Sequence, residues 1–302
     1  MNANVIEELE RRRHMFNQII QAYPTGRNVP PGFLRGLRVY SGQQGIYFDK
    51  ANTSGILGAK ESITVSVLHT GHHYPDDFSD RYLLYHYPDT RRAGHDEAEV
   101  RATKNACRVG MPIFVISYSQ AHSDLRDIFL GFVEGWDDAS KVFLITIYSH
   151  WVERSQYPHV LPEKLPPFQL ADQIQAQESS SPKHNSNQPL FKFRVLQRYG
   201  PKCAVCSVDR KEMLRATHLR PVTNDGSDDP RNGLILCANH HLAFNANLFA
   251  FDNSTLKVVF RPQGPNAHDL QITVDSLRSL PELPDQRALA WRYRYWKRVL
   301  GL

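Results

Sequence analysis

The sequence has 302 residues, 41% of them hydrophobic, which is enough to bury substantial cores and favours two domains. No apolar run approaches the roughly eighteen residues that cross a bilayer, and the charged N-terminus has no signal-peptide core, so we expect a soluble, cytoplasmic protein with no membrane partner. Its four cysteines are too few for a disulfide scaffold, and in a reducing compartment they favour metal binding.

The N-terminal half is predicted to start with a helix and continue with strands. Residues 4–22 place apolar side chains at helical spacing, and Pro24 and Gly26 end this amphipathic helix. From about 37 to 150, β-rich runs alternate with turn residues: SITVSVLHT, RYLLYHY, MPIFVISYS and KVFLITIYS. One helical segment interrupts them, HDEAEVRATKNACRVG, with Gly110 as its C-terminal stop. Many short strands around one helix predict a curled sheet or barrel in an α+β protein.

Residues 166–190 are rich in Pro, Ser, Gln and Asn, which predicts a linker between domains at 1–165 and 191–302. The tail RALAWRYRYWKRVLGL predicts a basic, aromatic helix. Two interpretations of this helix stay open. In one its aromatic side chains pack on the domain, and in the other its cations face phosphate, namely Arg292, Arg294, Lys297 and Arg298.

Positive charge is concentrated in the last third of the chain. From residue 191 onward there are 17 Lys and Arg against 10 Asp and Glu, a net charge of +7, whereas the remainder carries −2. Such a distribution is typical of a module that binds phosphate groups, although a solvated basic surface would give the same count.

Two pairs of metal-ligand residues share the same two-residue gap, Cys203 with Cys206 and Cys237 with His240. A Cys-x2-Cys pair alone is typical of either a redox disulfide or a metal site, and the second pair favours the metal. Three thiolates and one imidazole form a closed tetrahedral Zn²⁺ site. We expect this zinc to be structural, because four protein ligands leave no position for a substrate.

The order of Cys-x2-Cys, ATHLRP, DDPRNGLILC and ANHHLAFN resembles the HNH nuclease family, whose ββα-metal fold would here be zinc-stapled. The resemblance covers about 191–252 and places the three motif letters on His218, Asn232 and His241. It implies that His218 is the general base and that Asn232 pins the loop orienting it. His241 and Asn245, four residues apart on a helix, would hold a divalent cation, Mg²⁺ or Mn²⁺, against the phosphate.

Two positions depart from the pattern of many HNH relatives, which carry aspartate where this chain has Thr217 and Asn245. Fewer formal negative charges would then face the cation, which leaves the preferred metal open. The predicted phosphate contacts are the basic residue next to the motif and three in the tail: Arg220, Arg292, Arg294 and Lys297.

The segment SVLHTGHHYPDDFSDRYLLYHYPDT resembles the SRA domains that read modified cytosine in DNA, and the resemblance spans about 37–150. The matching residues are Tyr74, Asp76, Asp77, Asp80 and either Tyr85 or Tyr87. The resemblance implies that tyrosines stack on a flipped base while Asp77 accepts from the cytosine amino group. Alternatively, the tyrosines belong to a strand core and the aspartates to a turn. Histidines replace the second glycine of the family's turn, which leaves the modified base open.

The sequence therefore predicts an SRA-like or PUA-like curled β-barrel with flanking helices, a linker and an HNH endonuclease domain. This organisation resembles type IV restriction endonucleases that cut double-stranded DNA containing 5-methyl- or 5-hydroxymethylcytosine. The alternatives are an HNH nuclease that recognises unmodified DNA or RNA, and a non-catalytic nucleic-acid reader. A double-strand break needs two active sites, and a homodimer is one arrangement that would supply them.

Overall fold

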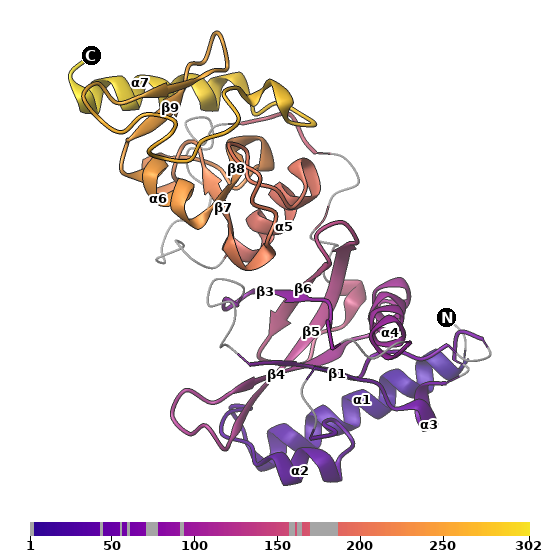
Figure 1. The fold of residues 1–302 in the computed structure, drawn as a ribbon. Coiled ribbons are helices and arrows are strands. Elements are labelled where there is room, and N and C mark those ends of the chain that lie inside the picture. Colours follow the sequence, from indigo (N-terminus) through magenta and orange to yellow (C-terminus); the bar gives the residue numbers. More distant parts are fainter. Residues whose placement is uncertain are drawn as a thin grey trace. The chain divides into compact units, whose positions relative to one another are not determined.

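The computed structural model describes residues 3–42, 45–54, 56–58, 61–70, 78–90, 94–156, 161, 165–169 and 187–302. The chain divides into two compact units, drawn in Figure 1. Unit 1 comprises Met1–Trp136 and Lys141–Pro162, and unit 2 comprises Asp137–Ser140 and Glu163–Leu302. Within the described ranges, no helix combines the length and the apolar composition that a membrane crossing requires.

A six-stranded sheet forms the centre of unit 1, and its strands are β1 (Ile46–Tyr47), β2 (Ser66–His69), β3 (Tyr82–His86), β4 (Ile113–Tyr118), β5 (Arg126–Asp137) and β6 (Val142–Tyr148). Their order in the sheet is β1-β2-β4-β5-β6-β3. Strands β2 and β4 are parallel, whereas β1–β2, β4–β5 and β3–β6 are antiparallel pairs. The four β-rich runs of the sequence are confirmed as β2, β3, β4 and β6.

Strand β5, with 12 residues, lies between β4 and β6 and is not predicted by the sequence patterns. Gly131 in this strand has no room for a side chain. A Cβ there would lie 2.7 Å from Val115 Cγ2 and 2.9 Å from Ile145 Cγ2. The glycine thus lets side chains of the neighbouring strands fill the space that its own side chain would need.

The helices of unit 1 are α1 (Ala3–Ala22), α2 (Pro31–Gly36), α3 (Lys50–Thr53) and α4 (His95–Val109). The two predicted helices are confirmed as α1 and α4. Gly110 ends α4 with a left-handed φ of 64°, and its N–H donates to carbonyls of the last helical turn. A glycine is favoured there because other residues seldom adopt this conformation.

Both faces of the sheet are covered, which explains why its central strands are almost continuously apolar. Side chains alternate along a strand, so neighbouring residues of β4 point to opposite faces. Ile113 and Val115 pack in a first core cluster that includes Ala106 of α4. Phe114 packs in a second core cluster with Phe16 of α1. In Figure 1, α1 and α2 lie along one side of the sheet and α4 on the other.

Unit 2 contains α5 (Gln188–Tyr199), β7 (Leu214–His218), β8 (Gly233–Cys237), α6 (Ala238–Asn245), β9 (Phe249–Phe251), β10 (Val258–Phe260) and α7 (Gln286–Leu300). Strands β7 and β8 form one antiparallel hairpin, and β9 and β10 form another. Helix α6 follows β8 directly, which gives the order of a ββα fold. The described 3-10 helices of unit 2 are Lys211–Met213, Val222–Asn224, Pro230–Asn232 and Leu277–Ser279, and unit 1 has one at Arg154–Gln156.

The described start of the predicted linker is packed in unit 2. Phe168 is only 6% exposed and lies beneath the guanidinium groups of Arg231 and Arg287, 5.3 and 4.7 Å from its ring centroid. The linker prediction from composition therefore missed an anchor at this end. The α+β class is confirmed, with a curled sheet and flanking helices followed by a ββα region.

Candidate active site

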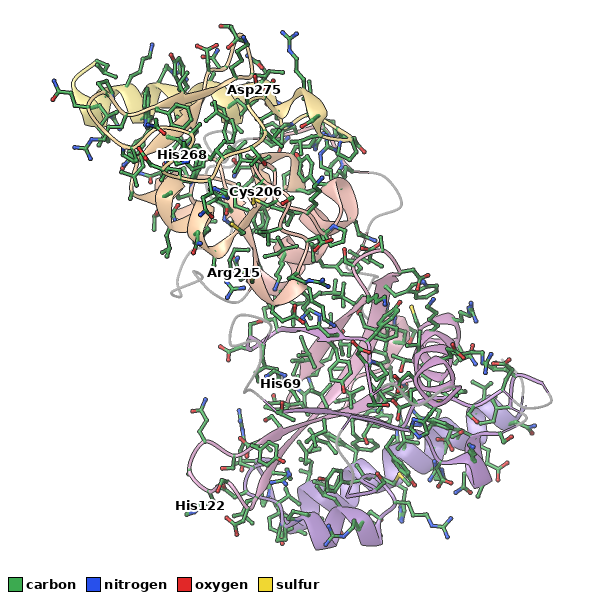
Figure 2. All side chains as sticks on the ribbon, viewed as in Figure 1. His69, His122, Cys206, Arg215, His268 and Asp275 are labelled. Atoms are coloured by element: carbon green, nitrogen blue, oxygen red, sulfur yellow. The ribbon has the colours of Figure 1, made fainter. Side chains whose placement is uncertain are left out.

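Four metal-ligand side chains lie together in unit 2, where Figure 2 labels Cys206. Cys203 and Cys206 lie in the loop after α5, Cys237 ends β8, and His240 lies in the first turn of α6. Their ligand atoms all lie within 4.8 Å of one another, and all four residues are buried. The fold thus brings the two sequence pairs to one point.

A backbone carbonyl orients the histidine of this cluster. The Leu270 carbonyl oxygen lies 2.8 Å from His240 Nε2, so Nε2 carries the ring proton and Nδ1 faces the sulfurs of Cys237 and Cys203, at 3.1 and 3.5 Å. Such an outer partner fixes the tautomer of a metal-binding histidine. Burial, followed by the nearby Cys203, raises the pKa of the Cys206 thiol to about 12. A bound cation would favour the thiolates, and this donor set suits zinc.

His218 ends β7, and its ring is held against α5. It is paired with Gly233 across the hairpin. A Cβ at Gly233 would lie 2.6 Å from the Phe191 ring, so this glycine lets α5 approach closely. The rings of Phe191 and His218 are stacked, with centroids 3.7 Å apart and planes inclined by 6°. Packing therefore fixes the plane of the His218 ring.

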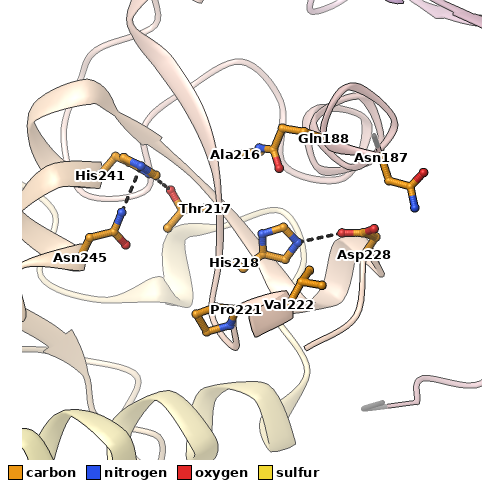
Figure 3. A pocket seen from close by; sticks show the side chains of 10 residues that line it. All are labelled: Asn187, Gln188, Ala216, Thr217, His218, Pro221, Val222, Asp228, His241 and Asn245. Carbon is orange, nitrogen blue, oxygen red and sulfur yellow. Dashed lines mark hydrogen bonds and ion pairs between the residues drawn. The ribbon is translucent and has the colours of Figure 1, made fainter. Parts of the chain in front are cut away.

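Asp228 is a carboxylate beside His218 that sequence reasoning missed. Its Oδ1 lies 3.0 Å from His218 Nε2 (Figure 3). Burial would raise the pKa of Asp228, but the hydrogen bond and charge of His218, with a hydrogen bond from Asn187, hold that pKa below its usual value. Asp228 is therefore an ionised acceptor. In the sequence, Asp228 is marked only by being the first residue of the DDPRNG segment, which also contains Asn232.

Asn232 is fully buried and connects the two ends of the loop that follows His218. Its amide oxygen accepts from the Arg220 backbone N–H at 3.0 Å. Its Nδ2 donates to the backbone carbonyls of Arg220 and Ser227, each at 2.8 Å. These three bonds are the geometry that a loop-pinning asparagine needs.

The same loop requires a glycine at position 226. A Cβ there would lie 1.8 Å from the Arg220 carbonyl oxygen and 2.7 Å from that of Pro221. We expect Gly226→Ala to destabilise unit 2 by about 1–3 kcal/mol, because backbone atoms must move to admit the methyl group. Thermal unfolding measures this loss. Gly36→Ala, with nothing within 4 Å of the added methyl, is the control, and equal melting temperatures for the two variants would contradict the expectation.

His241 and Asn245 lie on one face of α6. Thr217 Oγ1 lies 2.8 Å from His241 Nδ1, and Asn245 Nδ2 lies 3.1 Å from His241 Nε2. A histidine whose Nδ1–H is donated to the Thr217 hydroxyl keeps its lone pair on Nε2. That nitrogen and the Asn245 amide oxygen, brought forward by rotation of the amide, could hold a cation. Thr217 stands where many relatives have aspartate, and here it contacts the histidine.

These side chains meet in one pocket of about 330 Å³ (Figure 3). It is lined by Asn187, Gln188, Ala216, Thr217, His218, Pro221, Val222, Asp228, His241 and Asn245. A proton acceptor and two candidate cation ligands therefore open onto the same space. Hydrolysis of a phosphodiester needs such a combination, because water must be activated and charge on the phosphate neutralised.

Two of the four predicted phosphate contacts are buried within unit 2, which differs from the expectation. Arg220 and Arg292 are each 6% exposed. Arg220 Nε donates to the Asn224 carbonyl at 2.5 Å, and Arg292 Nη1 donates to Asn247 Oδ1 at 2.9 Å. Burial lowers the pKa of Arg292 to about 10. Both guanidinium groups join elements of this unit.

The other two predicted phosphate contacts lie nearer to solvent. Arg294 is exposed on α7, and Lys297 is half-buried with its amine 4.8 Å from the Tyr293 ring centroid. The neighbouring Arg298 is also exposed. Helix α7 packs on the unit through Trp296 and three other buried residues, as the first interpretation of the tail expects, and the phosphate-facing interpretation stays a prediction.

Only part of the predicted base pocket falls within the described residues. Tyr74, Asp76 and Asp77 lie outside them, and Asp80 is exposed before β3. Tyr85 lies on β3 and Tyr87 directly follows the end of this strand, and both pack against the first core cluster.

The surroundings of the two tyrosines differ. Burial, assisted by the Glu99 charge, raises the pKa of Tyr85. The Tyr87 ring has its centroid 4.5 Å from that of Phe143 and lines a pocket of about 530 Å³ beside Lys104. Of the two, Tyr87 therefore borders the described cavity.

Residues 203–252 match the family model described as HNH endonuclease. This segment runs from the first cysteine of the buried cluster to the end of β9 and includes the ββα hairpin and helix. The chain therefore carries an HNH endonuclease domain, and it is a nuclease.

Two restriction endonucleases are among the solved structures that are similar to this chain. The first, titled "Modification dependent TagI restriction endonuclease", has a TM-score of 0.33 and 16% sequence identity over 89% of this chain and 91% of that chain. The second, titled "Structure of the Type IV phosphorothioation-dependent restriction endonuclease ScoMcrA", has a TM-score of 0.30 and 15% identity. That match covers 91% of this chain and 59% of the other. None of the curated proteins matches this sequence.

Proposed function

We propose that this protein is a metal-dependent endonuclease that cleaves double-stranded DNA containing modified cytosine, 5-methyl- or 5-hydroxymethylcytosine. The observation that carries the nuclease chemistry is the shared pocket of His218, His241 and Asn245 in the HNH domain. The reader assignment rests on the SRA resemblance of the unit 1 sequence, and it is the part that needs a direct test.

In this proposal His218 takes a proton from the attacking water. The water oxygen then bonds to phosphorus, and the bond between phosphorus and the 3′ oxygen breaks. The departing oxygen takes a proton from solvent, which leaves 5′-phosphate and 3′-hydroxyl ends. His241 and Asn245 would hold Mg²⁺ or Mn²⁺, and such a cation would supply charge neutralisation at the phosphate.

Zinc in the buried cluster has a structural part in the proposal. Cys203 and Cys206 belong to the loop after α5, whereas Cys237 and His240 belong to the β8–α6 junction. One ion would hold these segments together and so fix the hairpin that carries His218. Four protein ligands leave no open coordination position for water or substrate.

A cleavage assay on matched duplexes tests the proposal as a whole. Two plasmids of the same sequence, one with and one without modified cytosine, are incubated with the protein over a series of Mg²⁺ and Mn²⁺ concentrations. We expect metal-dependent cuts in the modified plasmid and few in the other. Equal cutting of both would refute modified-cytosine specificity, and no cutting with any metal would refute nuclease function on DNA.

The reader is tested at Tyr87, because this tyrosine borders the pocket in unit 1. We expect Tyr87→Ala to weaken binding to the modified duplex by about 1–3 kcal/mol, the usual contribution of one base–aromatic stack. Weak, salt-sensitive binding to plain DNA should persist. Tyr87→Phe keeps the aromatic face and is the control. Undiminished discrimination by Tyr87→Ala would place base recognition elsewhere.

Helix α7 provides a test of phosphate binding in unit 2. We expect the double variant Arg294→Glu/Lys297→Glu to weaken binding to all DNA sequences and to reduce the slope of log K against log salt by about 2. Arg278→Glu makes the same kind of charge change at an exposed position outside α7. An unchanged salt slope in the double variant would remove α7 from the interface.

A further inference from the structure

We propose that Asp228 is a positioning residue that holds His218 in one tautomer, with Nε2 protonated and Nδ1 as the nitrogen that accepts the proton of the attacking water. This inference rests on the proposed nuclease function and assigns a role to a residue that no sequence motif marked. In this arrangement His218 is the base, and the Asp228 carboxylate orients it.

The tautomer follows from the partner of Nε2. An ionised carboxylate only accepts hydrogen bonds, and a neutral imidazole carries its proton on one ring nitrogen. Since Asp228 Oδ1 lies 3.0 Å from His218 Nε2, the proton belongs on Nε2. Nδ1 then keeps its lone pair, which is what a general base needs.

Two independent contacts fix the orientation of the ring. The stacked Phe191 ring, 3.7 Å away between centroids, fixes the plane of the His218 ring. The bond to Asp228 selects the rotation within that plane, because only one ring nitrogen reaches the carboxylate. The His218 side chain is 15% exposed, so one edge of the ring remains open to the pocket.

The position of Asp228 is itself determined by its neighbours in the chain. Asn232 Nδ2 donates to the carbonyl of Ser227 at 2.8 Å, directly before Asp228. The side chain of Asp229, directly after it, accepts from the Arg231 backbone N–H at 2.8 Å. The motif asparagine thus acts on His218 through the loop segment that carries Asp228.

The hydrogen bond between His218 and Asp228 also stabilises the charged histidine that proton transfer would produce. When Nδ1 takes the proton from water, His218 becomes an imidazolium, and the Asp228 carboxylate faces its Nε2–H. Asn187, by a hydrogen bond, and the charge of Arg194 also act on this carboxylate. A carboxylate in this place stabilises the imidazolium without taking its proton, as in the serine-protease triad.

The test combines kinetics with the spectroscopic signature of the tautomer. In the full-length protein we expect Asp228→Asn to lower the single-turnover cleavage rate by about 10²–10⁴, with little change in the concentration of DNA giving half-maximal rate. Nitrogen-15 NMR of histidine-labelled protein should report protonated Nε2 for His218 in the unsubstituted chain and lose that signature in the variant. The signal is assigned by its absence in His218→Ala.

Asp225→Asn is the matched control, because Asp225 lies in the same loop, has a side chain 79% exposed and lies outside the pocket. It should cleave at the unsubstituted rate. Its left-handed φ of 57° suits asparagine, so the change should not strain the loop.

The outcomes separate this inference from the proposed function. Cleavage by a folded His218→Ala would refute the proposed mechanism. Inactive His218→Ala together with fully active Asp228→Asn would overturn the role proposed for Asp228 and leave the proposed nuclease mechanism in place. If Asp228→Asn fails to fold, the unsubstituted protein still decides, because a signal from the Nδ1-protonated tautomer would overturn the inference.

Discussion

Cys206→Ala is expected to unfold unit 2 at temperatures where the unsubstituted protein is stable. A structural zinc site supplies about 10 kcal/mol or more to small modules, whereas a whole domain is stable by only about 5–15 kcal/mol. The four ligands come from two segments, so the loss of one weakens the join between them. Calorimetry and metal analysis should show a lost or strongly lowered transition and a loss of the one zinc expected per chain.

Cys107→Ala is the matched control for this experiment. Cys107 is also a free cysteine, but it lies in α4 of unit 1, outside the cluster. Its replacement should leave the zinc content and the unfolding of unit 2 unchanged. A strong chelator should reproduce the effect of Cys206→Ala in the unsubstituted protein. Full stability of zinc-free protein would end the idea of a zinc-dependent fold.

The metal cluster could be predicted from the sequence because each half of it is local. Two residues between ligands are enough to bring both side chains of a pair to one ion, so spacing alone indicated Cys203, Cys206, Cys237 and His240. What the spacing did not contain was the Leu270 carbonyl that orients His240, 30 residues further along the chain. A group that orients a metal ligand in this way comes from whichever segment packs against that ligand, and local spacing does not indicate it.

Asp228 shows the same limit at the pocket. It is ten residues from His218, and no periodic pattern joins the two. Their meeting depends on a tight loop, which needs the space at Gly226 and the three hydrogen bonds of Asn232. The three motif residues could be recognised in the sequence. The carboxylate beside His218 could be identified only from the path that the loop takes in the structure.

Strand β5 was missed for a related reason. Its glycine at 131 and its charged ends lower the strand propensity of the run RDIFLGFVEGWD. In the sheet, the missing side chain is compensated by Val115 and Ile145, which occupy its space. Tertiary packing here overrides the local preference.

Charge counts also did not reveal which cations face solvent. Arg292 lies among the aromatic residues of α7 and is buried. Its guanidinium lies over the Phe244 ring and donates to the Phe244 carbonyl near the end of α6. A cation is favourable at a helix C-terminus because the last carbonyls lack helical partners. A net charge of +7 therefore overestimates the charge available to a phosphate backbone.

His218→Ala is expected to keep the fold, the metal cluster and DNA binding but to lose cleavage by about 10²–10⁴ in rate, the usual value of a general base. His218 is not one of the four clustered ligands, so its loss should leave zinc in place. The removed ring leaves Phe191 without its stacked partner, which should lower the melting temperature only modestly. A nicking assay on modified plasmid, with folding and zinc content measured in parallel, checks this.

His241→Ala should also abolish cleavage, but for a different physical reason that a metal titration can separate. Its loss removes one candidate ligand of the cation and leaves Asn245, so it weakens metal binding while keeping the base. Raising Mg²⁺ or Mn²⁺ should then restore part of the activity by mass action. No metal concentration should rescue His218→Ala to the same degree, because the missing group is a proton acceptor. Equal rescue of both variants would place His218 among the cation ligands, and near-unsubstituted cleavage by folded His218→Ala would refute the proposed mechanism.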